Sequence, residues 1–154
     1  MDKLFSIKPF WAFGIFALLD LICVGMGMGV PIFCILFGFF VGWYIVRHIT
    51  LTTPLATQVF RKVLWYASVT SAFTFLVMFI IWAPFATYFF DPARDLAQTG
   101  IPMILYEPRA SFVGWIALMI LISPFLQLLT TSFGAYLTLL HWLQKGEVKV
   151  PLSI

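Results

Sequence analysis

The sequence predicts an all-α integral membrane protein with four transmembrane helices, which form two hairpins and leave both termini on the cytoplasmic side. Composition, the length of the apolar runs and the placement of basic residues predict this fold. Of the 154 residues, 62% are hydrophobic and 10% are charged, whereas soluble domains have roughly 45–50% apolar and about 25% charged residues. Such a chain cannot cover a water-facing surface. We therefore expect one transmembrane domain over residues 1–154, with the lipid bilayer as its main partner.

The first apolar run is too long for a single span. Residues 10–46 contain one charged residue, Asp20, yet about 20 apolar residues suffice to cross a membrane. Alternating glycines and a proline interrupt the run at 25–31, where each glycine weakens a helix by about 1 kcal/mol and proline favours a new first turn. The sequence therefore predicts helices at about 9–26 and 31–48. Both are short, so the pair either spans fully or forms a re-entrant hairpin.

Two longer helices follow the first hairpin. A Thr-Pro pair, which favours a helix start, opens a third helix at about 54–89. Pro84 should kink its outer end. A polar stretch over 91–110 then forms an outer loop. The fourth helix covers about 112–144, with a kink expected at Pro124.

Lysine and arginine residues gather on one side of the predicted membrane. Seven lie on the side where the chain begins and ends: Lys3, Lys8, Arg47, Arg61, Lys62, Lys145 and Lys149. Two lie in the outer loop: Arg94 and Arg109. Basic residues near span ends mark the cytoplasmic side. The distribution therefore predicts cytoplasmic termini and a multi-pass protein of the plasma (inner) membrane.

Asp20 is the one charged residue well inside a predicted span. An acid near the bilayer centre costs about 2.5–3.5 kcal/mol on insertion scales, so it usually faces protein or water. One interpretation is a cation or proton site beside the glycine-rich turn, because broken helices build ion sites in several transporters. The other, which we favour, is a buried polar anchor paired with another helix. Candidate partners are Gln127, Ser71, Thr74, Thr130 and Thr131.

Sulfur-containing residues surround the glycine-rich turn. They are Cys23, Met26, Met28 and Cys34. Thiolate and thioether ligands favour Cu(I), but the spacing matches no recurring metal motif. Ordinary core or lipid-facing packing is the alternative interpretation.

Two histidines lie at similar predicted depth near the ends of the second and fourth helices, at His48 and His141. Histidines on different helices of a bundle can ligate haem b axially. Alternatively, each histidine complements the negative end of its helix dipole. No cofactor is predicted as the first choice, and haem stays open as an alternative.

Gly38 and Gly42 match the pattern of small residues four apart that lets two membrane helices approach closely. We expect a packing role for them, within the chain or against another subunit.

The sequence contains no arrangement typical of an enzyme. It has no Ser/His/Asp or Cys/His constellation and no phosphate-binding glycine loop, so no catalytic residue is predicted. Nucleic acid is not an expected partner, because no basic stripe is interleaved with aromatic residues.

Three classes of function remain open. The first is a non-catalytic subunit or scaffold that packs with other membrane subunits, or with further copies of itself, in a larger complex. The second is a small ion or solute transporter or channel that uses Asp20 and the turn at 25–31. The third is an electron-transfer subunit that holds haem between His48 and His141.

Overall fold

The computed structural model describes residues 7–25, 30–50, 56–91, 95–96, 102 and 105–144, and all regular structure among them is helical. The elements are α2 (Pro9–Gly25), α3 (Val30–Thr50), α4 (Ala56–Trp82), the 3-10 helix η1 (Ala83–Phe90), α5 (Pro108–Ala117), the π-helical turn η3 (Leu118–Ile122) and α6 (Ser123–Gln144). The all-helical fold class is confirmed.

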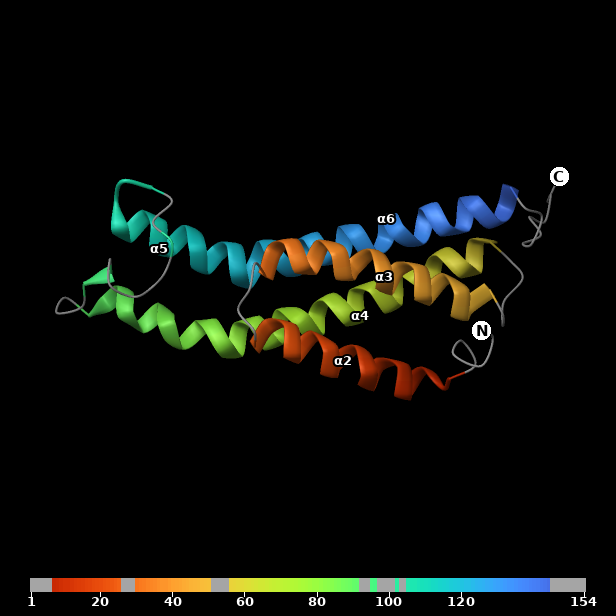
Figure 1. The fold of residues 1–154 in the computed structure, drawn as a ribbon, viewed down its shortest axis with the longest axis horizontal. Coiled ribbons are helices and arrows are strands. Elements are labelled where there is room, and N and C mark those ends of the chain that lie inside the picture. The colour runs from red at the N-terminus through yellow and green to blue at the C-terminus, as the bar shows by residue number, and fades with distance from the viewer. Residues whose placement is uncertain are drawn as a thin grey trace.

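The helices form an elongated bundle (Figure 1). α4 with η1 and α5 with α6 run along its whole length, whereas α2 and α3 lie beside only part of it (Figure 1). α2 begins, α3 ends, α4 begins and α6 ends at the same end of the bundle (Figure 1). We call this the basic end, because Lys8, Arg47, Arg61 and Lys62 belong to these helix termini. The opposite end is the far end.

Three helical stretches are long and apolar enough to cross a membrane. They are Pro31–Ile49, Gln58–Phe90 and Pro108–Gln144. α2 is also apolar but has only 17 residues, which at 1.5 Å per residue is about 26 Å. Within the most apolar window of each stretch, 28%, 28% and 33% of residues are buried. Most residues in these windows are therefore half-buried or exposed, and apolar helices with such faces are expected to contact lipid.

Helix boundaries agree with the sequence except near the outer loop. The fourth helix begins at Pro108 and not at 112, so the predicted loop over 91–110 is too long at its C-terminal end. Proline fits this first helical turn because its missing N–H would have no partner there. The Ser111 hydroxyl donates to the Leu105 carbonyl at 2.9 Å and accepts from the Leu105 N–H at 2.7 Å. The polar residues that suggested a loop therefore help to start a helix.

Both predicted proline kinks coincide with a change of helix type. Near Pro84 the α-helix ends at Trp82 and a 3-10 helix follows. Pro124 comes just after the π-helical turn η3, whose Leu118 carbonyl accepts the Ser123 N–H. The π-helical turn is wider than an α-helical one, so it accommodates Pro124, which has no N–H to donate and whose ring crowds the preceding turn.

Several predicted features lie outside the described residues. They are the turn within 26–29, the Thr-Pro helix start before Ala56, most of the loop over 92–101, and both ends of the chain.

Two apolar clusters hold the bundle together, one toward each end. The basic-end cluster joins α3, α4 and α6 through Ile45, Val46, Ile49, Val59, Val63, Ala135, Leu139 and Trp142. The far-end cluster joins α2, α3, α4 and η3 through Val24, Cys34, Val77, Met78 and Met119. The Arg47 guanidinium lies 4.8 Å from the ring centre of Trp142 and adds a cation–π contact at the basic end.

Candidate functional site

Buried polar side chains form a layer between the two apolar clusters. This polar layer consists of Asp20, Thr70, Ser71, Thr74, Ser123, Gln127 and Thr131. On α4 it occupies 70–74, between Val63 of one cluster and Val77 of the other. On α6 it occupies 123–131, again between members of the two clusters. The apolar–polar–apolar order along the helices places these polar groups at similar depth in the middle of the bundle.

Asp20 is held by α4. Its side chain is 3% exposed, and the Thr74 hydroxyl donates to its Oδ2 at 3.1 Å. Thr74 Oγ1 also lies 3.2 Å from the Thr70 carbonyl of the same helix. A hydroxyl carries a single proton, so Asp20 and the Thr70 carbonyl share one donor. Of the candidate partners considered from the sequence, Thr74 is the one bonded to Asp20.

A second polar contact joins α4 to α6. The Ser71 hydroxyl donates to the Pro124 carbonyl at 2.7 Å. Ser71 and Thr74 are three positions apart, so they lie on the same side of α4. Through these two residues α4 bonds to α2 and to α6 within one helical turn.

Gln127 and Thr131 are in the layer but are not paired. Both are fully buried, and within the described part of the chain the Gln127 amide and the Thr131 hydroxyl have no hydrogen-bond partner. A buried polar group without a partner costs about 1–3 kcal/mol. The expected pairing of Asp20 with Gln127 is therefore not the one that the described residues make.

Gly38 and Gly42 form the contact between α3 and α6. A Cβ on Gly38 would overlap Thr130 Oγ1 and would lie 2.9 Å from the Gln127 carbonyl oxygen. A Cβ on Gly42 would overlap the Thr131 carbonyl oxygen and would lie 2.8 Å from the Ala135 nitrogen. The glycine face of α3 is therefore occupied by α6 of the same chain, and the expectation that it contacts another subunit is not supported.

The structure describes only two of the four sulfur-containing residues around the glycine-rich turn. Cys34 is buried in the far-end cluster beside Met78 and Met119, while Cys23 is half-buried. Met26 and Met28 lie outside the described residues. Among the residues that the structure describes, no three His, Cys, Asp or Glu side chains gather as a metal site would require.

The two histidines face different surroundings. His48 is half-buried and stacks on Tyr44, with ring centres 6.2 Å apart. His141 is on the exposed side of α6. His48 lines two hollows described below, and His141 lines neither of them. Among the described residues, the two histidines therefore share neither of these hollows as axial haem ligands would.

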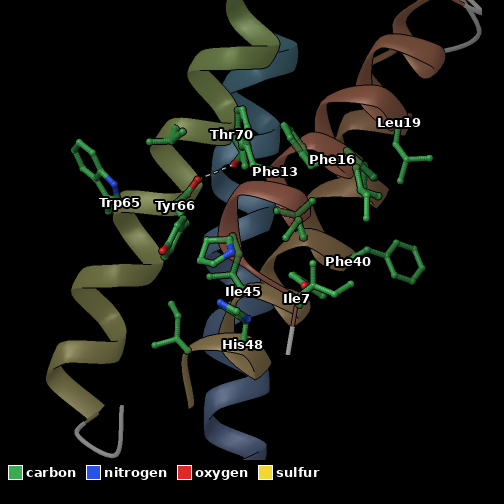
Figure 2. A pocket seen from close by; sticks show the side chains of 18 residues that line it. Ile7, Phe13, Phe16, Leu19, Phe40, Ile45, His48, Trp65, Tyr66 and Thr70 are labelled. Atoms are coloured by element: carbon green, nitrogen blue, oxygen red, sulfur yellow. Dashed lines mark hydrogen bonds between the residues drawn. The ribbon is translucent and has the colours of Figure 1, made fainter. Parts of the chain in front are cut away.

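An apolar cavity of about 400 Å³ lies between α2, α3 and α4. Phe13 and Phe16 of α2, Phe40 of α3 and Trp65 of α4 line it. Figure 2 shows His48 toward the basic end of this cavity and Thr70 toward the polar layer. The cavity exists because α2 diverges from the other helices toward the basic end (Figure 1).

A second hollow continues from this cavity at the basic end. It measures about 1080 Å³ and shares Ile7, Pro9, His48, Ile49, Trp65 and Tyr66 with the apolar cavity. Its further lining includes Lys8, Arg61 and Lys62. None of the described residues that line either hollow is acidic. We call the first hollow the apolar cavity and the second the basic mouth.

Sequence reasoning identified Asp20 and included Thr74 among its five candidate partners, but it did not predict the cavity. Polar residues three and four apart within the apolar run of α4, at 70, 71 and 74, were the signal for a buried polar face. The lysine and arginine residues of the mouth indicated only the orientation of the helices.

No protein-family model, no curated protein and no solved structure matches this chain. The fold and its apolar surface define the class: the chain is a small helical membrane protein, and its three candidate spans make it a candidate multi-pass one.

Proposed function

We propose that this chain is a non-catalytic subunit or scaffold that packs within a larger membrane complex. The observation that carries the proposal is the use of the buried polar groups. Asp20, the one acid in an apolar helix of the described chain, is buried and bonded to Thr74, and Ser71 is bonded to Pro124. These groups join helices to one another and present no reactive side chain to a substrate.

The proposed topology is four spans in two hairpins, with both termini in the cytoplasm. Lys8, Arg47, Arg61 and Lys62 belong to helix termini at one end of the bundle, and Arg109 begins α5 at the other. This asymmetry supports a cytoplasmic basic end under the positive-inside rule. The proposed location is the plasma (inner) membrane.

α2 is the element best placed to contact a partner subunit. It contacts the bundle through Val24, the Asp20–Thr74 bond and aromatic pairs such as Phe13 with Phe73 at 5.5 Å. Its other face carries exposed Leu18 and Trp11. A short apolar helix with one face unoccupied suits packing against another membrane chain.

Purification in a mild detergent tests the proposal, with the stoichiometry of co-purifying chains as the measurement. Leu18→Trp enlarges the outer face of α2, and Leu76→Trp makes the same change at a similarly exposed site on α4. We expect Leu18→Trp to lose a stoichiometric partner that wild type and Leu76→Trp retain, because lipid adapts to a bulky side chain and a packed interface does not. A chain that purifies alone in every case contradicts the proposal.

A transporter or channel is the second candidate function, and one observation favours it. The Gln127 amide and the Thr131 hydroxyl are buried in the polar layer with no partner within the described residues, and an ion or water would satisfy them. Flux into liposomes that contain the purified chain tests this candidate. Loss of flux in Asp20→Asn, with the fold retained, would support it.

The haem-binding class has less support, because His48 lines the two hollows described above and His141 lines neither of them. An absorption spectrum of the purified protein tests it directly. A haem band that disappears in His48→Ala would support haem binding by this chain.

A further inference from the structure

We propose that the apolar cavity and the basic mouth together bind one acidic phospholipid from the cytoplasmic leaflet. An acyl chain would occupy the cavity between α2, α3 and α4, and the anionic headgroup would lie at Lys8 and Arg61. The proposal rests on the proposed topology only for the leaflet that supplies the lipid. It is independent of whether the chain is a subunit or a transporter.

The cavity has the size and lining of a ligand site. Ligand pockets are commonly about 300–1,000 Å³ and mostly apolar, and this cavity measures about 400 Å³. Phe13, Phe16 and Phe40 contribute aromatic walls (Figure 2). Such a lining suits a hydrocarbon chain and does not suit a small polar solute.

The cavity is accessible from the surrounding lipid. Phe40 and Trp65 each line it, yet each side chain is 69% exposed in the bundle. Leu19 and Ile15 of α2 are also both lining and exposed. A wall of outward-facing apolar residues in a membrane opens toward lipid, so an acyl chain can enter sideways without crossing water.

The mouth supplies the charge complementarity. Lys8, Arg61 and Lys62 line it, and none of its described lining residues is acidic. Basic pockets between transmembrane helices on the cytoplasmic side bind anionic headgroups. A guanidinium such as that of Arg61 also suits the geometry of a phosphate.

The junction of the two hollows sets the depth of the lipid. Trp65, Tyr66 and His48 line both hollows. Tryptophan and tyrosine are enriched at the level of the headgroups. The junction therefore lies at the membrane interface, with the apolar cavity on its hydrocarbon side and the basic residues on its aqueous side, as a phospholipid requires.

Other occupants fit only half of the site. A free phosphate or soluble anion would use the basic mouth but leave the apolar cavity empty. An apolar helix from a second copy would cover the cavity but place its surface against Lys8 and Arg61. An acidic phospholipid matches both halves at once.

The test compares phosphatidylglycerol with phosphatidylcholine of identical acyl chains, bound to the purified full chain in mixed detergent micelles. Native mass spectrometry measures the retained lipid. Micelles have no sidedness, so a wrong topology would not affect the result. We expect wild type to retain phosphatidylglycerol preferentially, and excess glycerol 3-phosphate not to displace it, because the headgroup alone lacks the acyl contacts.

Charge variants test whether lipid retention depends on the basic residues of the mouth or on positive charge anywhere on the protein. Lys8→Gln or Arg61→Gln should each weaken phosphatidylglycerol retention about fivefold, the expected effect of one basic residue near a membrane surface. Arg109→Gln removes a positive charge from the exposed start of α5 at the far end and should change nothing. An equal effect of all three variants, or no preference between the lipids in wild type, would overturn the proposal.

Size variants test whether the lipid binds in the apolar cavity or elsewhere on the apolar surface. Ala12 lines the cavity, whereas Ala72 on α4 is exposed and does not. Ala12→Trp should fill the cavity and abolish retention of both lipids, while Ala72→Trp should retain them. Ala12→Ile is the milder alternative if the larger side chain prevents folding, as judged by circular dichroism and size-exclusion chromatography. Undiminished lipid retention in a folded Ala12 variant would contradict occupancy of the cavity.

Discussion

Asp20 lies where a charged group is costly, and its surroundings explain how the chain carries it. The carboxyl is removed from lipid and receives the Thr74 hydroxyl. Thr74 has a second acceptor, the Thr70 carbonyl, at nearly the same distance. Loss of the carboxyl would therefore not leave Thr74 without a partner, which limits the stability that the anchor can contribute.

This geometry predicts different results for two substitutions of Asp20. Asp20→Asn keeps an oxygen that accepts from Thr74, so we expect stability close to wild type. Asp20→Leu removes the interhelical bond and should destabilise the protein by about 0.6 kcal/mol, with an upper bound of about 1–2 kcal/mol. Unfolding in detergent by a denaturing surfactant measures both. A larger loss in Asp20→Asn than in Asp20→Leu would contradict the anchor.

An apolar substitution of Gln127 should not lower the stability of the protein, in contrast to Asp20→Leu. Its amide is fully buried without a partner among the described residues, and replacing such a group by an apolar one of similar shape is nearly neutral or stabilising. Gln127→Met should therefore change stability little, or raise it by about 1 kcal/mol. Thr131→Val is a matched test on the same helix. Marked destabilisation by both would show that the pair binds water, an ion or an undescribed group.

At the scale of elements, the tightest packing is between α3 and α6. Gly42 approaches the backbone of α6 at Thr131 and Ala135, whereas Gly38 approaches the side chain of Thr130 and, less closely, the Gln127 carbonyl oxygen. A backbone cannot rotate away from an added methyl group, whereas a threonine side chain can adopt another rotamer. The two glycines should therefore tolerate substitution differently.

Alanine substitutions test this difference. Gly42→Ala should push α3 from α6 and cost about 1–3 kcal/mol, as overpacking of a core does. Gly38→Ala should also destabilise, because its Cβ would lie 2.9 Å from the Gln127 carbonyl oxygen, but it should cost less, because its closest contact is the Thr130 side chain. A Cβ added at Gly14 of α2 would meet nothing within 4 Å, so Gly14→Ala is the control and should be neutral or favourable. Equal effects at all three positions, measured by thermal unfolding in detergent, would contradict the close approach.

The sequence predicted the positions of the helices better than it predicted which residues of different helices contact each other. The first hairpin was placed within a few residues, because glycine and proline interrupt helices for local reasons. The start of α5 was missed, because Ser111 looked like part of a polar loop but bonds to Leu105. Asp20 was visible as a charge in an apolar run. Thr74 was one of five candidate partners, and the choice among them was not predictable, because periodicity gives the buried face of a helix but not the helix opposite it.

The cavity and its mouth are features of the whole molecule. The cavity results from the angle at which α2 leaves the bundle, and no residue pattern in one segment encodes that angle. Its wall combines residues from the first helix to the third. The basic residues of the mouth were visible in the sequence, but their position beside an apolar cavity was not.

Topology is also tested on the whole molecule. Single cysteines replace Gln144 at the end of α6, or Glu107 just before α5, in a Cys23→Ala/Cys34→Ala background. In intact cells an impermeant thiol reagent should label only the Glu107→Cys protein, because α6 ends at the basic end, which is proposed to be cytoplasmic. Gln144→Cys should label only after the cells are opened. Labelling of Gln144→Cys from outside would reverse the proposed orientation.

The short first helix has a consequence for the bilayer itself. α2 is about 26 Å long and has 17 residues, while the apolar stretch through α5 and α6 has 37. The protein therefore offers a shorter apolar height on one flank than on the other. With α2 as a full span, as proposed, a bilayer with a core of about 30 Å must thin beside it, at a cost of fractions of a kcal/mol per ångström. Where thin and thick lipid phases coexist, this chain should partition into the thin one.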